Sequence, residues 1–377
     1  MADPWPALVD HHCHGVVTTD LDRAAFESLM NEATGPGPLG GTLFDSMLGV
    51  AIRRWCAPLL GLEQFAEPAA YIARRAALGS QEVNARFLQA ADVSDFVVDS
   101  GFDPDLVTSP ERTAAYAGGN GHEIIRLERI GEQALTNGAR DGTFGERVRE
   151  RLTDGGAIGA KSIAAYRVGL ALPPQQPTTD QLVTALRTVE PGTDGTFRIA
   201  HPVLNSWLAY EAIDVGLPLQ IHCGYGDNDL DLADCDPLLL TCFLRATEDR
   251  RIPVTLLHNY PYHRQAGYLA QVFGHVFMDV GLATHNSGAL SRTILRESLE
   301  LVPFAKMLYS SDAFGLGEFY YLGSLLFRRG LSHVLDGLVD DGELAGSDAE
   351  HITMLIARDN ARRVYGLRGS TSATGRR

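Results

Sequence analysis

The chain has 377 residues, and a length above roughly 250 residues is common for a single α/β barrel. Hydrophobic residues make up 45% and charged residues 21%, which excludes a largely disordered protein. The 32 basic and 47 acidic residues give a net charge of −15, so we do not expect non-specific binding to nucleic acid. No apolar run approaches the roughly 18 residues of a membrane span. Residues Met1–Gly15 lack a cationic stretch and an apolar core, so we expect no signal peptide.

The cysteines indicate a reducing compartment. They are five in number, are scattered and include no Cys-x-x-Cys pair, which argues against a disulfide framework. We therefore expect them to be small buried side chains and the protein to be cytoplasmic. They are Cys13, Cys56, Cys223, Cys235 and Cys242.

Eight short apolar runs predict β-strands, because they are four to eight residues long, several are rich in Val, Ile and Leu, and many end at turn-forming residues. In chain order they are Ala7–His14, Asp95–Asp99, Glu123–Glu128, Ala157–Ile163, Leu217–Cys223, Ile252–His258, Val276–Val280 and Met307–Ser311. Helical patterns occur at Pro202–Val215, Pro237–Asp249, Tyr262–Phe273, Leu290–Leu299 and Ala349–Tyr365. Ser347 and Glu350 predict a capping box for the last helix. Eight strands alternating with helices predict a (β/α)8 TIM barrel.

The segment between the first two predicted strands is long enough for a helical insertion, over about residues 16–91. Leu43–Cys56 and Gln64–Ala77 are amphipathic, and we expect the segment to cover the mouth of the barrel. The chain is then one domain over residues 1–367, followed by a polar tail at 368–377 that we expect to be disordered. A doubly wound fold is the weaker alternative, because no Gly-rich dinucleotide motif follows the first strand.

Side chains that can bind metal follow five of the predicted strands. His12 and His14 alternate along the first strand, so they share one face about 6.5 Å apart and can bind the same ion. The others, after strands four, five, six and eight, are Lys161, His222, His258 and Asp312. In a parallel barrel all strands open on one face at their carboxyl ends, so we expect these residues to converge. Taken singly, each histidine is also compatible with a buried structural role, and Asp312 with a helix cap.

This set of residues resembles the amidohydrolase superfamily of metal-dependent hydrolases. The order Asp-x-His-x-His, Lys, His, His, Asp is similar to its ligand pattern. Pro218–Gly224 and Tyr309–Phe314 resemble its strand-five and strand-eight signatures, and Arg358–Gly366 resembles its closing helix. Gly224–Asp231 is similar to a subgroup whose members are sometimes joined to a glutamine-synthetase-like domain. The resemblance spans Val9 to Leu367 and implies a divalent metal, with zinc as the first expectation and Mn, Fe or Ni also compatible.

The resemblance implies two arrangements of metal, and both remain open. In the first, one ion is bound by the two histidines of the first strand together with His222 and Asp312, and His258 acts as an acid or base. In the second, a carbamylated Lys161 bridges two ions, the second of which is bound by His222 and His258. Only two of the basic residues are lysine, and arginine cannot be carbamylated, which favours the bridge. Lys161 could equally be a charged clamp for the substrate.

The resemblance also implies a reaction, namely cleavage of an amide (C–N) bond in a small substrate by a metal-activated water. A bound cation lowers the pKa of water from about 16 to about 7. Asp312 would accept the proton and return it to the leaving group. Tyr166 and Arg167 follow strand four, and Arg167 is suited to bind a substrate carboxylate unless it is a surface cation. Asp227, Asp229 and Asp231 follow strand five and form an acidic loop that is either solvated or binds a substrate amine.

Two other functions remain open from the sequence. Some relatives with one metal are non-oxidative decarboxylases of small organic acids, which release CO2 without consuming water. A barrel without catalysis would serve as a metal-binding or interaction partner, and the presence of all six candidate ligands argues against this. We expect a small-molecule ligand, no nucleic acid and no membrane, and the sequence is compatible with a homo-oligomer.

Overall fold

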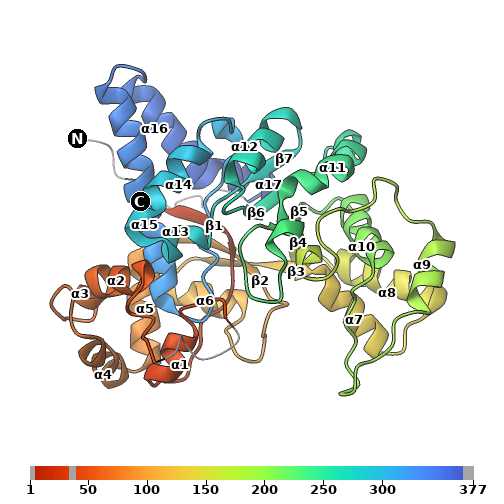
Figure 1. Cartoon of the computed structure of the whole chain (residues 1–377), viewed down its shortest axis with the longest axis horizontal. Helices are drawn as coiled ribbons and strands as arrows, with labels where there is room; N and C mark the ends of the chain where they lie inside the picture. The colour runs from red at the N-terminus through yellow and green to blue at the C-terminus, as the bar shows by residue number, and fades with distance from the viewer. Residues whose placement is uncertain (1–4, 34–39, 368–377) are drawn as a thin grey trace, which may run out of the picture.

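The computed structural model describes residues 5–33 and 40–367, and the predicted tail at 368–377 lies outside them. Seven parallel strands form one curled sheet in which every strand pairs with the next in sequence (Figure 1). They are β1 (Leu8–Cys13), β2 (Val93–Asp99), β3 (Asn120–Arg126), β4 (Ala157–Ser162), β5 (Leu219–Cys223), β6 (Val254–His258) and β7 (Val276–Met278). The first seven predicted strands are therefore confirmed, and the fold resembles a TIM barrel.

The prediction of an eighth regular strand, Met307–Ser311, is wrong. Its backbone does lie between β7 and β1, because Leu308 N donates to Met278 O at 2.9 Å and His11 N donates to Tyr309 O at 3.2 Å. A regular ladder does not form, because β7 has only three residues and the Ser311 N–H donates to the Asp10 side chain instead. The segment thus joins the two edges of the sheet through irregular backbone.

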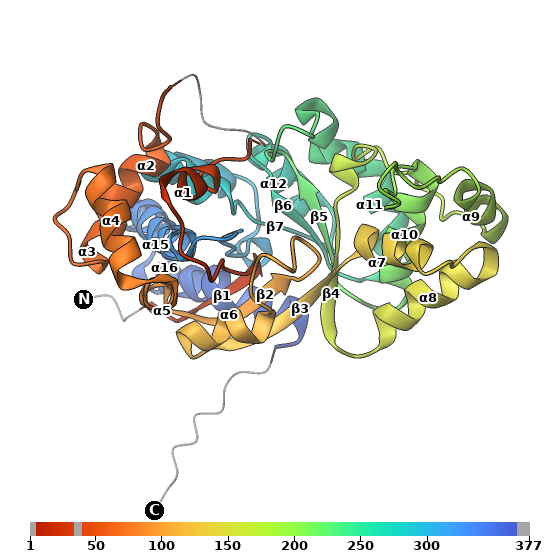
Figure 2. The same cartoon turned by 90° about the horizontal axis from the view of Figure 1, so that it is seen from below.

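Helices lie on both sides of the strands (Figure 2). Those between β1 and β2 are α1 (Arg23–Ser28), α2 (Met47–Ala51), the π-helical η1 (Ile52–Cys56), α3 (Ala57–Leu59), α4 (Pro68–Leu78) and α5 (Ser80–Ala91). Those between β2 and β5 are α6 (Pro110–Ala117), α7 (Leu127–Thr136), α8 (Asp141–Thr153), η2 (Ala164–Tyr166), α9 (Thr179–Leu186) and α10 (Pro202–Asp214). The interpretation of the first group as an insertion into the barrel stays a prediction.

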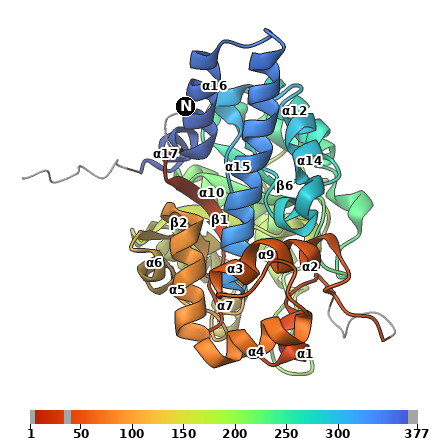
Figure 3. The same cartoon turned by 90° about the vertical axis from the view of Figure 1, so that its left-hand side faces the viewer.

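The later helices confirm part of the predicted pattern. They are η3 (Leu232–Cys235), η4 (Pro237–Leu240), α11 (Thr241–Thr247), η5 (Glu248–Arg250), α12 (His263–Val272), α13 (Ala283–Asn286), η6 (Gly288–Leu290), α14 (Ser291–Ser298), η7 (Phe304–Lys306), α15 (Gly317–Asp340), α16 (Gly346–Met354), η8 (Leu355–Asp359) and α17 (Asn360–Tyr365). The capping box at Ser347 is wrong, since α16 begins at Gly346 and Ser347 lies inside it. Helix α15 was not predicted. It runs through the molecule beside α5 (Figure 3).

Of the five cysteines, four are buried as expected, whereas Cys242 is exposed. Within the part of the chain that the structure describes, no helix has both the length and the apolar character needed to cross a membrane.

A buried charge network attaches α4 to α15. The Glu318 Oε1 atom accepts hydrogen bonds from Arg75 Nε and from Tyr71 Oη, each at 2.9 Å. The two charged side chains are 0% and 3% exposed, so neither can turn to water if its partner is lost. The network therefore holds the helices that follow β1 against the rest of the fold.

We expect Glu318→Ala to lower the free energy of unfolding by about 3 to 5 kcal/mol, because it leaves the Arg75 charge buried and unpaired. Urea denaturation would measure the change. Glu343→Ala, which removes an exposed carboxylate, is the control and should change stability by less than about 0.5 kcal/mol. A loss below about 1 kcal/mol in Glu318→Ala would mean that the network contributes little net stability.

Candidate functional site

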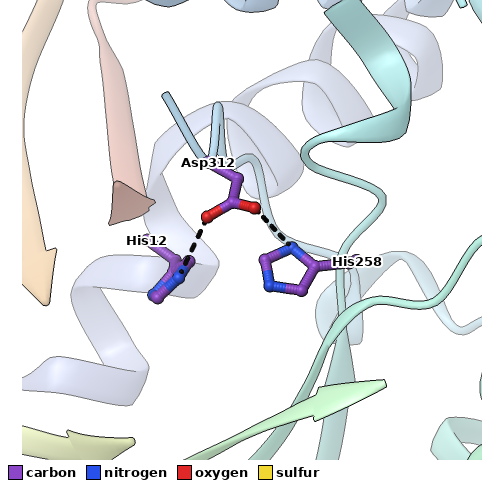
Figure 4. A group of neighbouring side chains, drawn as sticks. All are labelled: His12, His258 and Asp312. Carbon is purple, nitrogen blue, oxygen red and sulfur yellow. Dashed lines mark ion pairs between the residues drawn. The ribbon is translucent and has the colours of Figure 1, made fainter. Parts of the chain in front are cut away.

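The six predicted ligands come together where the strands end. Asp312 is at the centre: its Oδ1 lies 3.2 Å from His12 Nε2 and 3.4 Å from His14 Nε2, and its Oδ2 lies 3.2 Å from His258 Nδ1. Figure 4 shows the carboxylate between the rings of His12 and His258. Lys161 Nζ lies 3.3 Å from His12 Nε2, and the His222 ring centroid lies 4.5 Å from that of His258.

The donor atoms of this group fit a divalent cation. One nitrogen each of His12 and His258 and an oxygen of Asp312 lie within 4.8 Å of one another. Three buried atoms at the site, His222 Nε2, His258 Nδ1 and Asp312 Oδ1, have no hydrogen-bond partner among the residues that the structure describes, which is costly unless another group satisfies them. Imidazole nitrogens and a carboxylate are the ligands that zinc and related divalent metals prefer.

Hydrogen bonds behind the histidines fix their orientation. The Gln220 Oε1 atom, which can only accept, lies 2.8 Å from His12 Nδ1, so Nδ1 carries the hydrogen and Nε2 keeps its lone pair toward Asp312. The Gln220 amide is held in turn, because Nε2 donates to His11 O and Tyr365 Oη, both at 2.8 Å. The ring of His14 is oriented by Asp99 O, 3.3 Å from Nδ1.

The backbone at two of these residues is left-handed. Asp312 has φ +50° and His258 has φ +66°, conformations that are uncommon for residues other than glycine. Each is supported by hydrogen bonds, since Asp312 N donates to His12 O at 3.0 Å and His258 N donates to Asp279 Oδ1 at 2.8 Å. These bonds aim both side chains at the same point.

Burial and neighbouring charges determine which side chains of the site are protonated. Burial, reinforced by nearby Lys161, lowers the pKa of His12 to about 4, and burial holds the pKa of His222 and His258 well below the ordinary value. Burial also lowers the pKa of Lys161 to about 8. Burial alone would raise the pKa of Asp312, but the adjacent histidines outweigh it and hold the pKa well below its usual range. At neutral pH these imidazoles are therefore neutral and Asp312 is ionised, which is the state that binds metal.

A cavity of about 620 Å³ opens above the ligands, and both predicted substrate-binding residues line it. The Tyr166 ring centroid lies 4.6 Å from that of His222. Arg167 is not a surface cation, since its side chain is only 10% exposed and its Nη2 lies 3.2 Å from Glu132 Oε1. Its Nε and Nη1 atoms are buried without a partner.

Sequence reasoning missed several polar residues of the cavity. The charged ones include Glu32, Arg126, Arg129, Glu132 and Arg198, and the cavity is also lined by the buried His285. These residues lie mostly outside strand ends, so no regular pattern marks them. Of the acidic loop, Asp227 and Asp229 line the cavity, whereas the Asp231 side chain caps η3 by accepting from Ala233 N at 3.0 Å.

Comparisons with known proteins identify the family and the fold of the chain. A family model described as amidohydrolase matches residues 139–367. The FluG protein of Emericella nidulans is 32% identical over 237 residues, which are 59% of this chain and 27% of that protein, so the chain spans about a quarter of this curated relative. A crystal structure described as a metal-dependent hydrolase from Lactobacillus casei superposes with a TM-score of 0.82 at 27% identity, covering 97% of this chain and 98% of the other. Uronate isomerase from Thermotoga maritima shares the fold, with a TM-score of 0.64 at 12% identity over 96% and 94% of the two chains.

Proposed function

The chain belongs to the amidohydrolase family, and on this basis we propose that it hydrolyses the amide (C–N) bond of a small substrate that bears a carboxylate. The observation that carries the proposal is the position of Asp312, whose carboxylate lies within 3.4 Å of nitrogens of three histidines at the floor of a cavity. A buried carboxylate that stays ionised beside an open space is suited to take a proton from water and pass it on.

The proposed metal ligands are His12, His14, Lys161, His222, His258 and Asp312. When bound, a divalent cation, zinc by preference, makes water more acidic and polarises a carbonyl group. The protein's own part is to keep the imidazole nitrogens unprotonated and to fix the rings from behind, as Gln220 does for His12. The lowered pKa of Lys161 and its place 3.3 Å from His12 favour carbamylation over a role as a charged clamp.

The residues around the ligands would orient the substrate and move the proton. Asp312 would accept the proton of the attacking water and give it to the departing amine. While Asp312 carries this proton, the neutral His258, whose Nδ1 lies 3.2 Å from Asp312 Oδ2, would stabilise the protonated carboxyl group. A free N–H group of Arg167 would bind an oxygen of the substrate carboxylate. Tyr166, whose ring packs against His222, would cover one side of the reacting group of the substrate.

The activity test is a panel of small carboxylate-bearing amides assayed for release of amine, before and after removal of metal with a chelator. We expect amine release to stop on chelation and to return when zinc is added. Release of CO2 without consumption of water would favour decarboxylation instead. Metal content without turnover of any amide, ester, lactone or acid would indicate a protein without catalysis.

A separate experiment tests whether Lys161 is carbamylated. Metal analysis combined with native mass spectrometry should find two divalent ions per chain and an addition of roughly 44 Da on Lys161, because the buried amine loses its proton readily and can react with CO2. Lys306→Arg is the control, since it removes the other lysine and should leave both quantities unchanged. One ion per chain with an unmodified Lys161 would establish the single-ion arrangement.

A further inference from the structure

Charges of both signs line the cavity. Burial lowers the pKa of Arg167, and the basic residues Arg198 and Arg126 lower it further, whereas the neighbouring Glu132 opposes this. Glu32 has different neighbours: burial and the carboxylates of Asp312 and Asp227 raise its pKa to about 7. The charged groups that act on Glu32 are carboxylates, so its surroundings favour a cation, whereas the buried Arg167 favours an anion.

Glu32 is the strongest candidate for a group that binds a cation. It lies shortly after α1, between β1 and β2, is only partly exposed, and lines the cavity. Within residues 5–33 and 40–367, no basic side chain forms an ion pair with it. Asp227 lines the same cavity, and its Oδ1 accepts from the Asp229 backbone N–H at 3.0 Å. A carboxylate without a fixed counter-ion is stabilised when a cation binds beside it.

Arg167 provides the independent observation that this cavity is built for a polar ligand. Its side chain is nine-tenths buried, and Nη2 contacts Glu132. Within residues 5–33 and 40–367, Nε and Nη1 have no acceptor. Arg126 differs, because its Nε and Nη2 both donate to Asp99 Oδ2, at 2.9 and 2.6 Å. Nε and Nη1 lie on different edges of the guanidinium, so they cannot both reach one carboxylate, but Nη1 can donate to a carboxylate oxygen without breaking an existing bond.

We propose, building on the amide hydrolysis proposed above, that Glu32 and Asp227 bind a positively charged amine of the substrate while Arg167 binds its carboxylate. The substrate is then an amide that keeps both the free amine and the free carboxylate of an amino acid. A carboxylate-bearing amide without an amine would satisfy Arg167 but would bring no positive charge to Glu32 and Asp227.

Binding of three small acids tests this without turnover. L-Glutamate carries the amine and both carboxylates, glutarate lacks the amine, and 4-aminobutyrate lacks the carboxylate beside it. Isothermal titration calorimetry of the metal-loaded enzyme should give L-glutamate at least about tenfold higher affinity than either analogue. Glu32→Gln should reduce the ratio of the L-glutamate and glutarate affinities to near one, whereas Asp105→Asn, which removes an exposed carboxylate from the rim of the same cavity, should leave this ratio unchanged.

Equal affinity for L-glutamate and glutarate, or binding of neither, overturns the proposal. So does loss of metal from Glu32→Gln, because Glu32 would then serve the metal. The corresponding p-nitroanilides of L-glutamate, glutaric acid and 4-aminobutyric acid separate this proposal from the reaction itself. Selective binding of L-glutamate with no cleavage of any anilide would contradict amide hydrolysis while leaving the amine site intact.

Discussion

Asp312→Asn is expected to reduce turnover of the cleaved amide by a factor of about one thousand or more, because the amide group can neither accept the proton of water nor balance the charge of a cation. The fold should survive. The backbone at this position has φ +50°, and asparagine is among the few residues that adopt the left-handed conformation readily. Steady-state kinetics would measure turnover, and urea denaturation should give a free energy of unfolding within about 1 kcal/mol of the original.

Asp103→Asn is the matched control for this variant. Asp103 also lines the cavity with a left-handed backbone, φ +42°, but its side chain is exposed and is not among the candidate ligands. Its replacement by asparagine should leave turnover nearly unchanged. An undiminished rate in Asp312→Asn would remove Asp312 from the mechanism.

Gln220→Leu is expected to weaken metal binding by about 10- to 100-fold, with a parallel loss of turnover at limiting metal. Leucine has a similar size but removes the acceptor 2.8 Å from His12 Nδ1. The hydrogen of the His12 ring is then no longer fixed on Nδ1, and the ring loses its orientation toward Asp312. Competition with a chromophoric chelator would measure the metal affinity.

Gln220→Glu separates this role from simple packing. A glutamate side chain restores an acceptor for His12 Nδ1 but cannot donate to His11 O or Tyr365 Oη. If orientation of His12 is what Gln220 provides, metal affinity should recover in Gln220→Glu relative to Gln220→Leu even though stability falls. Equal metal affinity in both variants and in the original protein would show that His12 holds its orientation without Gln220.

The ligand set could be predicted from the sequence because the topology of parallel strands determines which strand ends lie together. Once His222 and His258 are placed at the ends of parallel strands, they must lie near His12 and His14, whatever the length of chain between them. A repeated local signal, a polar residue that ends an apolar run, was therefore enough. The same signal did not reveal Gln220, which lies within β5 and resembles any polar residue in a strand.

Helix α15 was not predicted because its glycines weaken the helical pattern of the sequence. A glycine inside a helix costs up to about 1 kcal/mol relative to alanine, so Gly323 and Gly330 weaken the helical pattern. In the folded protein they allow close packing: a Cβ at Gly330 would lie 2.4 Å from Leu295 Cδ1, and one at Gly323 would lie 3.1 Å from Ser311 Cβ. Tertiary contacts with α14 and with the segment before Asp312 thus override local propensity.

The charged residues of the cavity could not be predicted for a different reason. Glu32, Arg129 and Arg198 lie on helices and connections whose path over the sheet is set by side-chain packing. A sequence does not reveal which of many exposed-looking acids and arginines turn toward a site. Arg167 was found only because it follows a predicted strand closely.

The attachment of α4 to α15 through Glu318 has a consequence for how such an enzyme could change its substrate. The candidate metal ligands stand at the sheet, whereas Glu32 belongs to the stretch between β1 and β2 that the Glu318 network ties down from outside. In the proposed arrangement Glu32 is therefore held separately from the candidate metal ligands, whereas Arg167 and Asp227 follow β4 and β5. New side chains on the stretch between β1 and β2 could change which substrate binds without changing the candidate metal ligands.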